Sequence, residues 1–158
     1  ETGILPMKLY DENTTPASIK ERTFGTVPLI SWVNAGNTHV AFLNHDEENY
    51  KMIECHKPHS ANTYALKVTG SSMTAPSGHK YTFPEGYVII VDPEQAGDKT
   101  DGIFVIAKEV GNDAVTFKQL KYDGTQPYLN PLNPDYPKIF DEFRIIGKVI
   151  DVRPPGLP

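Results

Sequence analysis

The segment Pro84-Glu85-Gly86-Tyr87-Val88-Ile89-Ile90-Val91 is the strongest indicator of the fold class. Its first three residues favour a turn, and the apolar run after them is typical of a strand buried on both faces. Upstream, Tyr64-Ala65-Leu66-Lys67-Val68 alternates apolar and polar side chains, which predicts a half-buried strand. Downstream, strands are predicted at 103–108, 114–120 and 143–152, with turns at Gly111-Asn112 and Asp123-Gly124. The chain is therefore expected to be mostly β, with little helix.

The N-terminal quarter of the chain has a different pattern. Residues 1–26 are expected to be an exposed linker, because Asp11-Glu12-Asn13-Thr14-Thr15-Pro16 is polar and turn-rich. Val27-Pro28-Leu29-Ile30-Ser31-Trp32-Val33 is an apolar run of β type, and Asn34-Ala35-Gly36-Asn37 after it favours a turn. Residues 44–60 are polar, with a short helix predicted at 46–53. One folded domain is expected at 27–158.

Composition limits the classes of function. Fifteen Lys and Arg against twenty Asp and Glu give a net charge of −5, and the basic residues are scattered. Because nucleic-acid binding depends on clustered cationic surface, DNA contact is expected only through a segment not present in this sequence. Cys55 is the single cysteine, which excludes an internal disulfide and suits a reducing cytoplasm. No apolar run approaches the roughly 18 residues of a membrane span, so none is expected.

A candidate nucleophile lies in Val68-Thr69-Gly70-Ser71-Ser72-Met73, at the end of a predicted strand. Gly70 permits a sharp turn that exposes a following serine, although most serines in such turns only form hydrogen bonds within the turn. The segment is not a hydrolase nucleophile elbow, because Thr74 stands where G-x-S-x-G needs its second glycine. Met73 is expected to be a packing residue.

A serine hydroxyl needs an adjacent base to act as a nucleophile. The five histidines (His39, His45, His56, His59 and His79) are all expected in polar, loop-like segments. A lysine can serve if burial lowers its pKa, since burial disfavours the charged form. Strand alternation in 115–120 places Thr116, Lys118 and Leu120 on one face, although most strand lysines are simply solvated.

An ordered set of motifs resembles the C-terminal self-cleaving domain of lambdoid phage and LexA-type repressors. The similarity runs from about Val27 to Val152 and includes the stretches 71–76, 83–86, 91–96, 117–120, 131–137 and 146–149. The resemblance implies a compact LexA-like or signal-peptidase-like β fold with an extended N-terminal linker and a cleavage loop at 27–37. It also implies a serine endopeptidase that needs no cofactor and no metal.

The resemblance assigns roles to particular residues. It implies that Ser72 is the nucleophile, that Lys118 is the general base, and that the bond cut is Ala35–Gly36 of the chain itself. The backbone N–H of Ser72 is implied as an oxyanion donor, and Val33 is expected to anchor the loop in an apolar subsite.

The resemblance also implies partners. A homodimer is expected, with 139–140 and 143–149 as interface strands, because a repressor of a palindromic operator has two-fold symmetry. RecA filaments on single-stranded DNA are expected to favour the docked loop. Operator DNA is expected to be bound only through an N-terminal domain missing from this sequence, in the cytoplasm of a bacterial host.

Several alternatives stay open at this point. A UmuD-type accessory factor of a translesion polymerase shares the serine–lysine chemistry, and a non-catalytic dimerisation module could keep the same fold. Signal peptidases use a related dyad but need a membrane anchor, which this sequence does not have. Glu54-Cys55-His56 with His59 could suggest a metal, but the spacing matches no common zinc pattern and a polar loop is expected.

Overall fold

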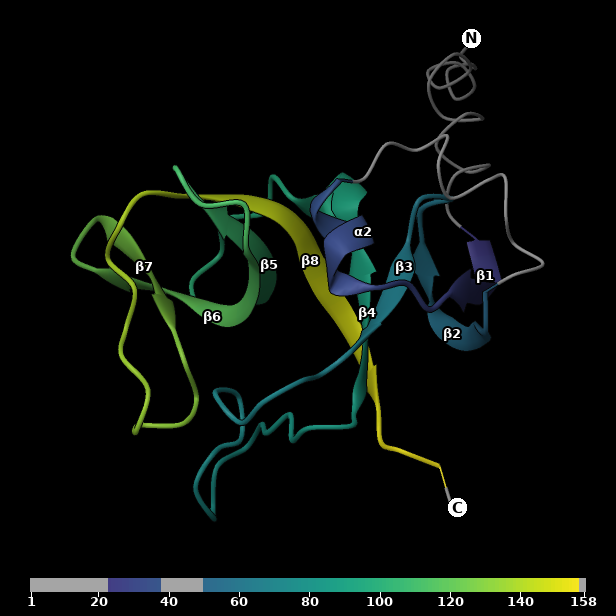
Figure 1. Ribbon diagram of the computed structural model, residues 1–158, viewed down its shortest axis with the longest axis horizontal. Helices are drawn as coiled ribbons and strands as arrows, with labels where there is room; N and C mark the ends of the chain where they lie inside the picture. Colours follow the sequence, from purple (N-terminus) through teal and green to yellow (C-terminus); the bar gives the residue numbers. More distant parts are fainter. Residues whose placement is uncertain (1–22, 38–49, 157–158) are drawn as a thin grey trace, which may run out of the picture.

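The computed structural model describes residues 23–37 and 50–156, which form two antiparallel sheets (Figure 1). A two-stranded sheet pairs β1 (Thr23–Pro28) with β2 (Met52–His59). A six-stranded sheet has the order β3-β4-β8-β5-β6-β7. Its strands are β3 (Tyr64–Lys67), β4 (Val88–Asp92), β5 (Phe104–Glu109), β6 (Val115–Asp123), β7 (Gln126–Asn130) and β8 (Phe143–Arg153). The prediction of a mostly β fold is confirmed.

Helical structure in the described residues is confined to the helix α2 (Trp32–Gly36) and the 3₁₀ turn η4 (Pro93–Gln95). The buried Asp92 carboxylate caps η4 and accepts hydrogen bonds from Ser60 Oγ at 2.6 Å and Gln95 Nε2 at 3.0 Å. Burial alone would raise the pKa of Asp92, but these hydrogen bonds outweigh it and hold the pKa below its ordinary value. In its charged form, the carboxylate therefore connects β4 to the residue after β2 and to η4.

Strand β8 is the centre of the large sheet. It pairs with β4 on one side and β5 on the other, and in Figure 1 it crosses the molecule as the long yellow strand. A Cβ atom at Gly147 would lie 2.5 Å from Val91 Cγ1, so the close approach of β8 to β4 requires glycine there. Within 143–149, expected to be an interface strand, the backbone pairs with β5 from Phe143 to Lys148, whereas β4 pairs with β8 only from Lys148 onward. The backbone edge of 143–147 opposite β5 therefore has no strand partner among the described residues, and the interface there stays a prediction.

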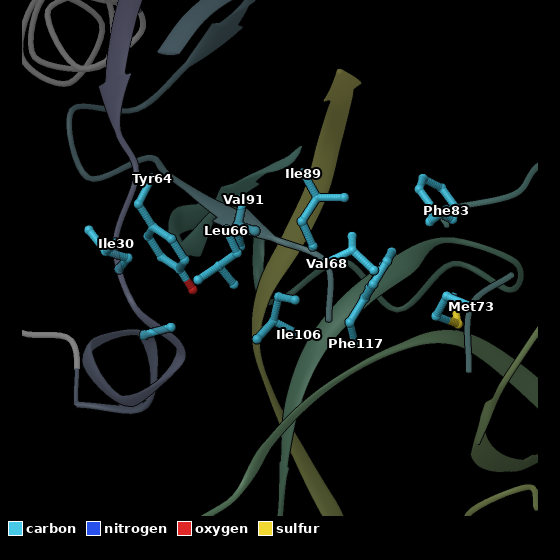
Figure 2. Packing of buried hydrophobic residues seen from close by; sticks show 11 residues of the cluster. Ile30, Tyr64, Leu66, Val68, Met73, Phe83, Ile89, Val91, Ile106 and Phe117 are labelled. Atoms are coloured by element: carbon cyan, nitrogen blue, oxygen red, sulfur yellow. The ribbon is translucent and has the colours of Figure 1, made fainter. Parts of the chain in front are cut away.

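The main core supports the turn that carries Ser72. Figure 2 shows Val68, Met73, Phe83 and Phe117 on one side of this cluster, which also contains the buried residues Ile89 and Val91 of β4. The rings of Phe83 and Phe117 meet edge to face with centroids 5.1 Å apart. Met73 is 1% exposed, which confirms that it is a packing residue. Burial of such a side chain contributes roughly 2 kcal/mol to the free energy of folding. Met73 therefore anchors the Ser72 turn to the core.

Two expectations for the N-terminal part are wrong in detail. Strand β1 begins at Thr23 and pairs with β2, so the folded part starts inside the expected linker; residues 1–22 lie outside the described residues. Of the helix predicted at 46–53, residues 46–49 also lie outside, and Met52 and Ile53 belong to β2. Pairing with β1 and the packing of Ile53 and Cys55 beside Val27 favour a strand there over local helix propensity.

Candidate active site

The turn after β3 presents Ser72 at the edge of the large sheet. Gly70 has a φ of +76°, a conformation that favours glycine, and the turn closes with a 3.1 Å hydrogen bond from Thr74 N to Ser71 O. Ser72 is half-buried, while the next residue, Met73, is in the core. The sharp turn predicted from Gly70 is confirmed, and it leaves the Ser72 hydroxyl accessible.

Ser72 and Lys118 are brought together from segments 46 residues apart in the chain. Lys118 Nζ lies 3.2 Å from Ser72 Oγ, within hydrogen-bond reach. Nζ also lies 2.8 Å from Thr116 Oγ1 and 3.2 Å from the carbonyl oxygen of Phe117. A neutral amine has two N–H donors and one lone pair. Two acceptors can therefore take both N–H groups and leave the lone pair for the Ser72 hydroxyl proton.

The environment of Lys118 favours its neutral form. The residue is 8% exposed, and it is the one buried lysine among the residues that the structure describes. Burial lowers the pKa of Lys118 below its ordinary value of 10.5, and the negative charge of Glu109 opposes this shift only in part. The lysine can therefore act as a base at lower pH than a solvated one.

The structure distinguishes the two adjacent serines. Ser71 Oγ lies 3.0 Å from the hydroxyl oxygen of Tyr136, whereas Ser72 Oγ lies next to Lys118 Nζ. Asn133 lies in the same 131–137 loop as Tyr136 and hydrogen-bonds the backbone of both serines. The sequence does not predict this contact, although the 131–137 stretch is one of the motifs that carry the family resemblance. The position of Ser72 therefore fits the nucleophile, and that of Ser71 does not.

The expected scissile bond lies in α2 and not in a turn. Ser31 caps the helix by accepting a hydrogen bond from Asn34 N at 3.1 Å, a cap signal that the expected turn overlooked. Ala35 is fully buried and Val33 is 72% exposed. The carbonyl oxygen of Gly36 accepts a 3.3 Å hydrogen bond from Lys108 Nζ. Within the described residues no hydrogen bond joins Ser72 to Ala35 or Gly36, so the segment is close to the site but not in it.

Trp32 and Val115 border both the Ser72–Lys118 pair and the expected scissile segment. Both line a cavity of about 290 Å³ that also contains Ser72 and Lys118, and both line a second cavity of about 440 Å³ beside Gly36. The indole N–H of Trp32 donates to the carbonyl oxygen of Lys67 at 2.9 Å. A Cβ atom at Gly36 would lie 2.8 Å from Val115 Cγ2, so α2 packs directly on the strand that carries Lys118.

The side chains of the segment that could suggest a metal site, Glu54-Cys55-His56 with His59, do not point to a common site. Strand alternation in β2 turns Cys55 into the core, and the exposed side chains of Glu54 and His56 pair at 3.5 Å on the outside. His56 and His59 lie in β2 and not in a loop, and His59 is buried. The described residues contain no group of three or more His, Cys, Asp or Glu side chains placed to hold a metal ion. Nor does any helix among them have the length and apolar character to cross a membrane.

Comparison with known proteins finds one matching family and several relatives named as transcriptional regulators or repressors. The sequence matches the family "Peptidase S24-like" over residues 28–150. It is 46% identical over 118 residues to the HTH-type transcriptional regulator for conjugative element SXT of Vibrio cholerae, covering 73% of this chain and 53% of the relative. It is 40% identical over 141 residues to Repressor protein C2 of Salmonella phage P22, covering 85% and 62% respectively.

A more distant relative is the LexA repressor of Shouchella clausii. It is 30% identical over 137 residues, which cover 85% of this chain and 60% of the relative. The chain thus spans between about half and three fifths of the length of these proteins.

Proposed function

Because this chain belongs to the Peptidase S24-like family, we propose that it is the self-cleaving part of a transcriptional repressor and cuts its own Ala35–Gly36 bond. The observation that carries the proposal is the 3.2 Å separation between Lys118 Nζ and Ser72 Oγ in a buried, partly enclosed site. Cleavage separates residues 1–35 from the rest of the chain and so inactivates repression.

The reaction follows from the groups at the site. Neutral Lys118 takes the Ser72 hydroxyl proton as Oγ attacks the carbonyl carbon of Ala35, and the developing oxyanion is stabilised by the N–H of Ser72. The bond to Gly36 then breaks, and the lysine ammonium returns the proton to the leaving amine. Water, deprotonated by the same lysine, hydrolyses the Ser72 ester. Because nucleophile and substrate share one chain, attack gains a large effective molarity once the loop is docked.

The proposed reaction requires α2 to leave its present conformation. Attack needs the Ala35 carbonyl carbon within roughly 3–3.5 Å of Ser72 Oγ, and the bond now lies in a helix packed on Val115. In the docked conformation, the unwound segment would bury the now exposed Val33 side chain in an apolar subsite. The same segment would shield Lys118 further from solvent. A RecA filament on single-stranded DNA would act by binding the docked conformation more tightly than the helical one.

The names of the relatives favour a repressor over a polymerase accessory factor or a non-catalytic module. They are an HTH-type regulator, a phage repressor and a LexA repressor, each longer than this chain. The proposal accordingly includes a cytoplasmic homodimer in a bacterial host that binds operator DNA through a separate N-terminal domain. Sedimentation at micromolar concentration should detect the dimer, and a strict monomer up to about millimolar, the weak end of specific association, would contradict it.

The decisive test is intact-mass analysis of the purified chain after incubation near pH 10, about the ordinary pKa of lysine. We expect two products that meet between Ala35 and Gly36. Ser72→Ala and Lys118→Met should show no detectable cleavage, because each removes a reacting group. Ser71→Ala is the matched control and should still cleave. Cleavage that persists in Ser72→Ala would overturn the proposal.

A further inference from the structure

The loop at 131–137, between β7 and β8, holds the backbone on both sides of Ser72 through one residue. Asn133 N donates to the Ser72 carbonyl oxygen at 3.0 Å, and Asn133 Nδ2 donates to the Ser71 carbonyl oxygen at 3.0 Å. The two segments are 62 residues apart in the chain. Besides linking the two loops, this contact sets the orientation of the peptide groups at Ser72.

The side-chain amide of Asn133 is itself fixed in direction. The side-chain Oδ1 accepts a 2.9 Å hydrogen bond from Asp135 N. The backbone carbonyl oxygen of Asn133 accepts another from Tyr136 N at 3.1 Å. Because Oδ1 is committed to a backbone donor, the NH₂ end of the amide has to face Ser71. The neighbouring Leu132 packs on the main core and anchors the loop. Asn133 therefore donates from a rigid support.

The geometry of the peptide unit carries this orientation to Ser72. In the trans peptide between Ser71 and Ser72, the C=O and N–H groups point in opposite directions. The Ser71 C=O is held towards Asn133 and Thr74, so the Ser72 N–H points away from the 131–137 loop. Within the described residues this N–H has no hydrogen-bond acceptor. It is a preorganised donor without a partner, beside a cavity lined by Ser72 and Lys118.

We infer that Asn133 is a positioning residue that holds the Ser71–Ser72 peptide so that the Ser72 N–H donates to the oxyanion formed at Ala35. This inference rests on the proposed function and adds a residue to it. Without the amide donor, the Ser71 carbonyl oxygen keeps only the hydrogen bond from Thr74 N. The Ser71–Ser72 peptide then has more freedom to rotate, and the Ser72 N–H aligns less well when charge develops. Asn133 touches neither Lys118 nor the reacting carbonyl, so it should affect the rate of attack but not the titration of the base.

The test compares the pH–rate profiles of Asn133→Asp and Asn133→Ser with the wild-type chain. Both variants keep an oxygen that can accept from Asp135 N, and both lose the donor to Ser71. We expect the plateau rate to fall about tenfold, less than the roughly 100-fold loss for removing an oxyanion donor outright, with the pH midpoint unchanged. Tyr136→Phe, which removes only the hydroxyl next to Ser71 Oγ, is the matched control and should stay within about twofold.

Other outcomes contradict either the role of Asn133 or the proposed function. Plateau rates within about threefold of wild type, or a loss accompanied by a shift of the midpoint towards free lysine, overturn the role of Asn133. If circular dichroism finds Asn133→Asp unfolded, the uncharged Asn133→Ser decides. A wild-type chain that does not cleave, or a Ser72→Ala variant that does, overturns the proposed function itself and this inference with it.

Discussion

The Ser72–Lys118 pair and the proposed scissile segment both contact β6, but only the Ser72–Lys118 pair is already arranged for the proposed reaction. Lys118 is buried, has a lowered pKa and lies 3.2 Å from Ser72 Oγ. The Ala35–Gly36 bond, by contrast, is helical, and its residues make their contacts with Ser31, Lys108 and Val115. In the proposed reaction, the nucleophile and the base are therefore already in place. Control over the proposed cleavage would then reside in the segment that carries Ala35–Gly36.

The restraint on that segment is small in energy. A five-residue helix such as α2 has little stability of its own, so it depends on its contacts. Its polar contacts are the Ser31 cap, the Lys108 hydrogen bond to Gly36 and the Trp32 hydrogen bond to Lys67. At about 1 kcal/mol each, these three amount to a few kcal/mol, to which the burial of Ala35 in the core adds. A partner that prefers the docked segment by that margin is enough to shift the population.

The larger effect is expected on the dyad side, at Thr116. Thr116→Val keeps the shape of the side chain but removes the 2.8 Å acceptor of Lys118 Nζ. The amine loses one of the two contacts that aim its lone pair at Ser72, and we expect cleavage to slow about tenfold, equivalent to one hydrogen bond of about 1.4 kcal/mol. First-order rate constants measure this, and Thr116→Ser should restore most of the rate. An unchanged rate in Thr116→Val would mean that Lys118 is positioned without Thr116.

A smaller effect of opposite sign is expected on the substrate side. Ser31→Ala removes the cap of α2 and should destabilise the helical conformation by about 1 kcal/mol. If the helix is the restraint, the docked fraction rises and cleavage becomes about fivefold faster. Ser31→Thr keeps a capping hydroxyl and should cleave at nearly the wild-type rate. Cleavage of Ser31→Ala at the wild-type rate or more slowly would contradict the claim that the helical conformation of α2 restrains the reaction.

The sequence predicts five of the six strands of the large sheet, because each of these has a hydrophobic pattern of its own, whereas β7 is indicated only by the Asp123-Gly124 turn before it. In the run at 87–91, Ile89, Ile90 and Val91 are fully buried as expected, while the first two residues are partly buried. The turn at Gly70 follows from the backbone freedom of glycine. Strand alternation correctly places Thr116 and Lys118 on one face. It does not indicate how deeply Lys118 is buried, because that depends on Ser72, Met73 and Trp32 from distant segments.

The features missed by the sequence depend on contacts between distant segments. β2 is a strand because it pairs with β1, and α2 forms where Ser31 caps it and β6 supports it. Asn133 is invisible in the sequence as a partner of Ser72, since the 131–137 loop reaches the turn only in the folded chain. The signals that were present were local and weak, such as a capping serine before the expected turn.

The most direct test of the central claim is the first-order rate constant of self-cleavage from about pH 6 to 11, a range that brackets the free pKa values of histidine and lysine. If neutral Lys118 is the base, the rate rises about tenfold per pH unit and then levels off. Because burial lowers the pKa of Lys118, the levelling should begin below its ordinary value of 10.5. A profile that is flat, or that has its midpoint near the value of about 6.5 typical of histidine, would contradict the account.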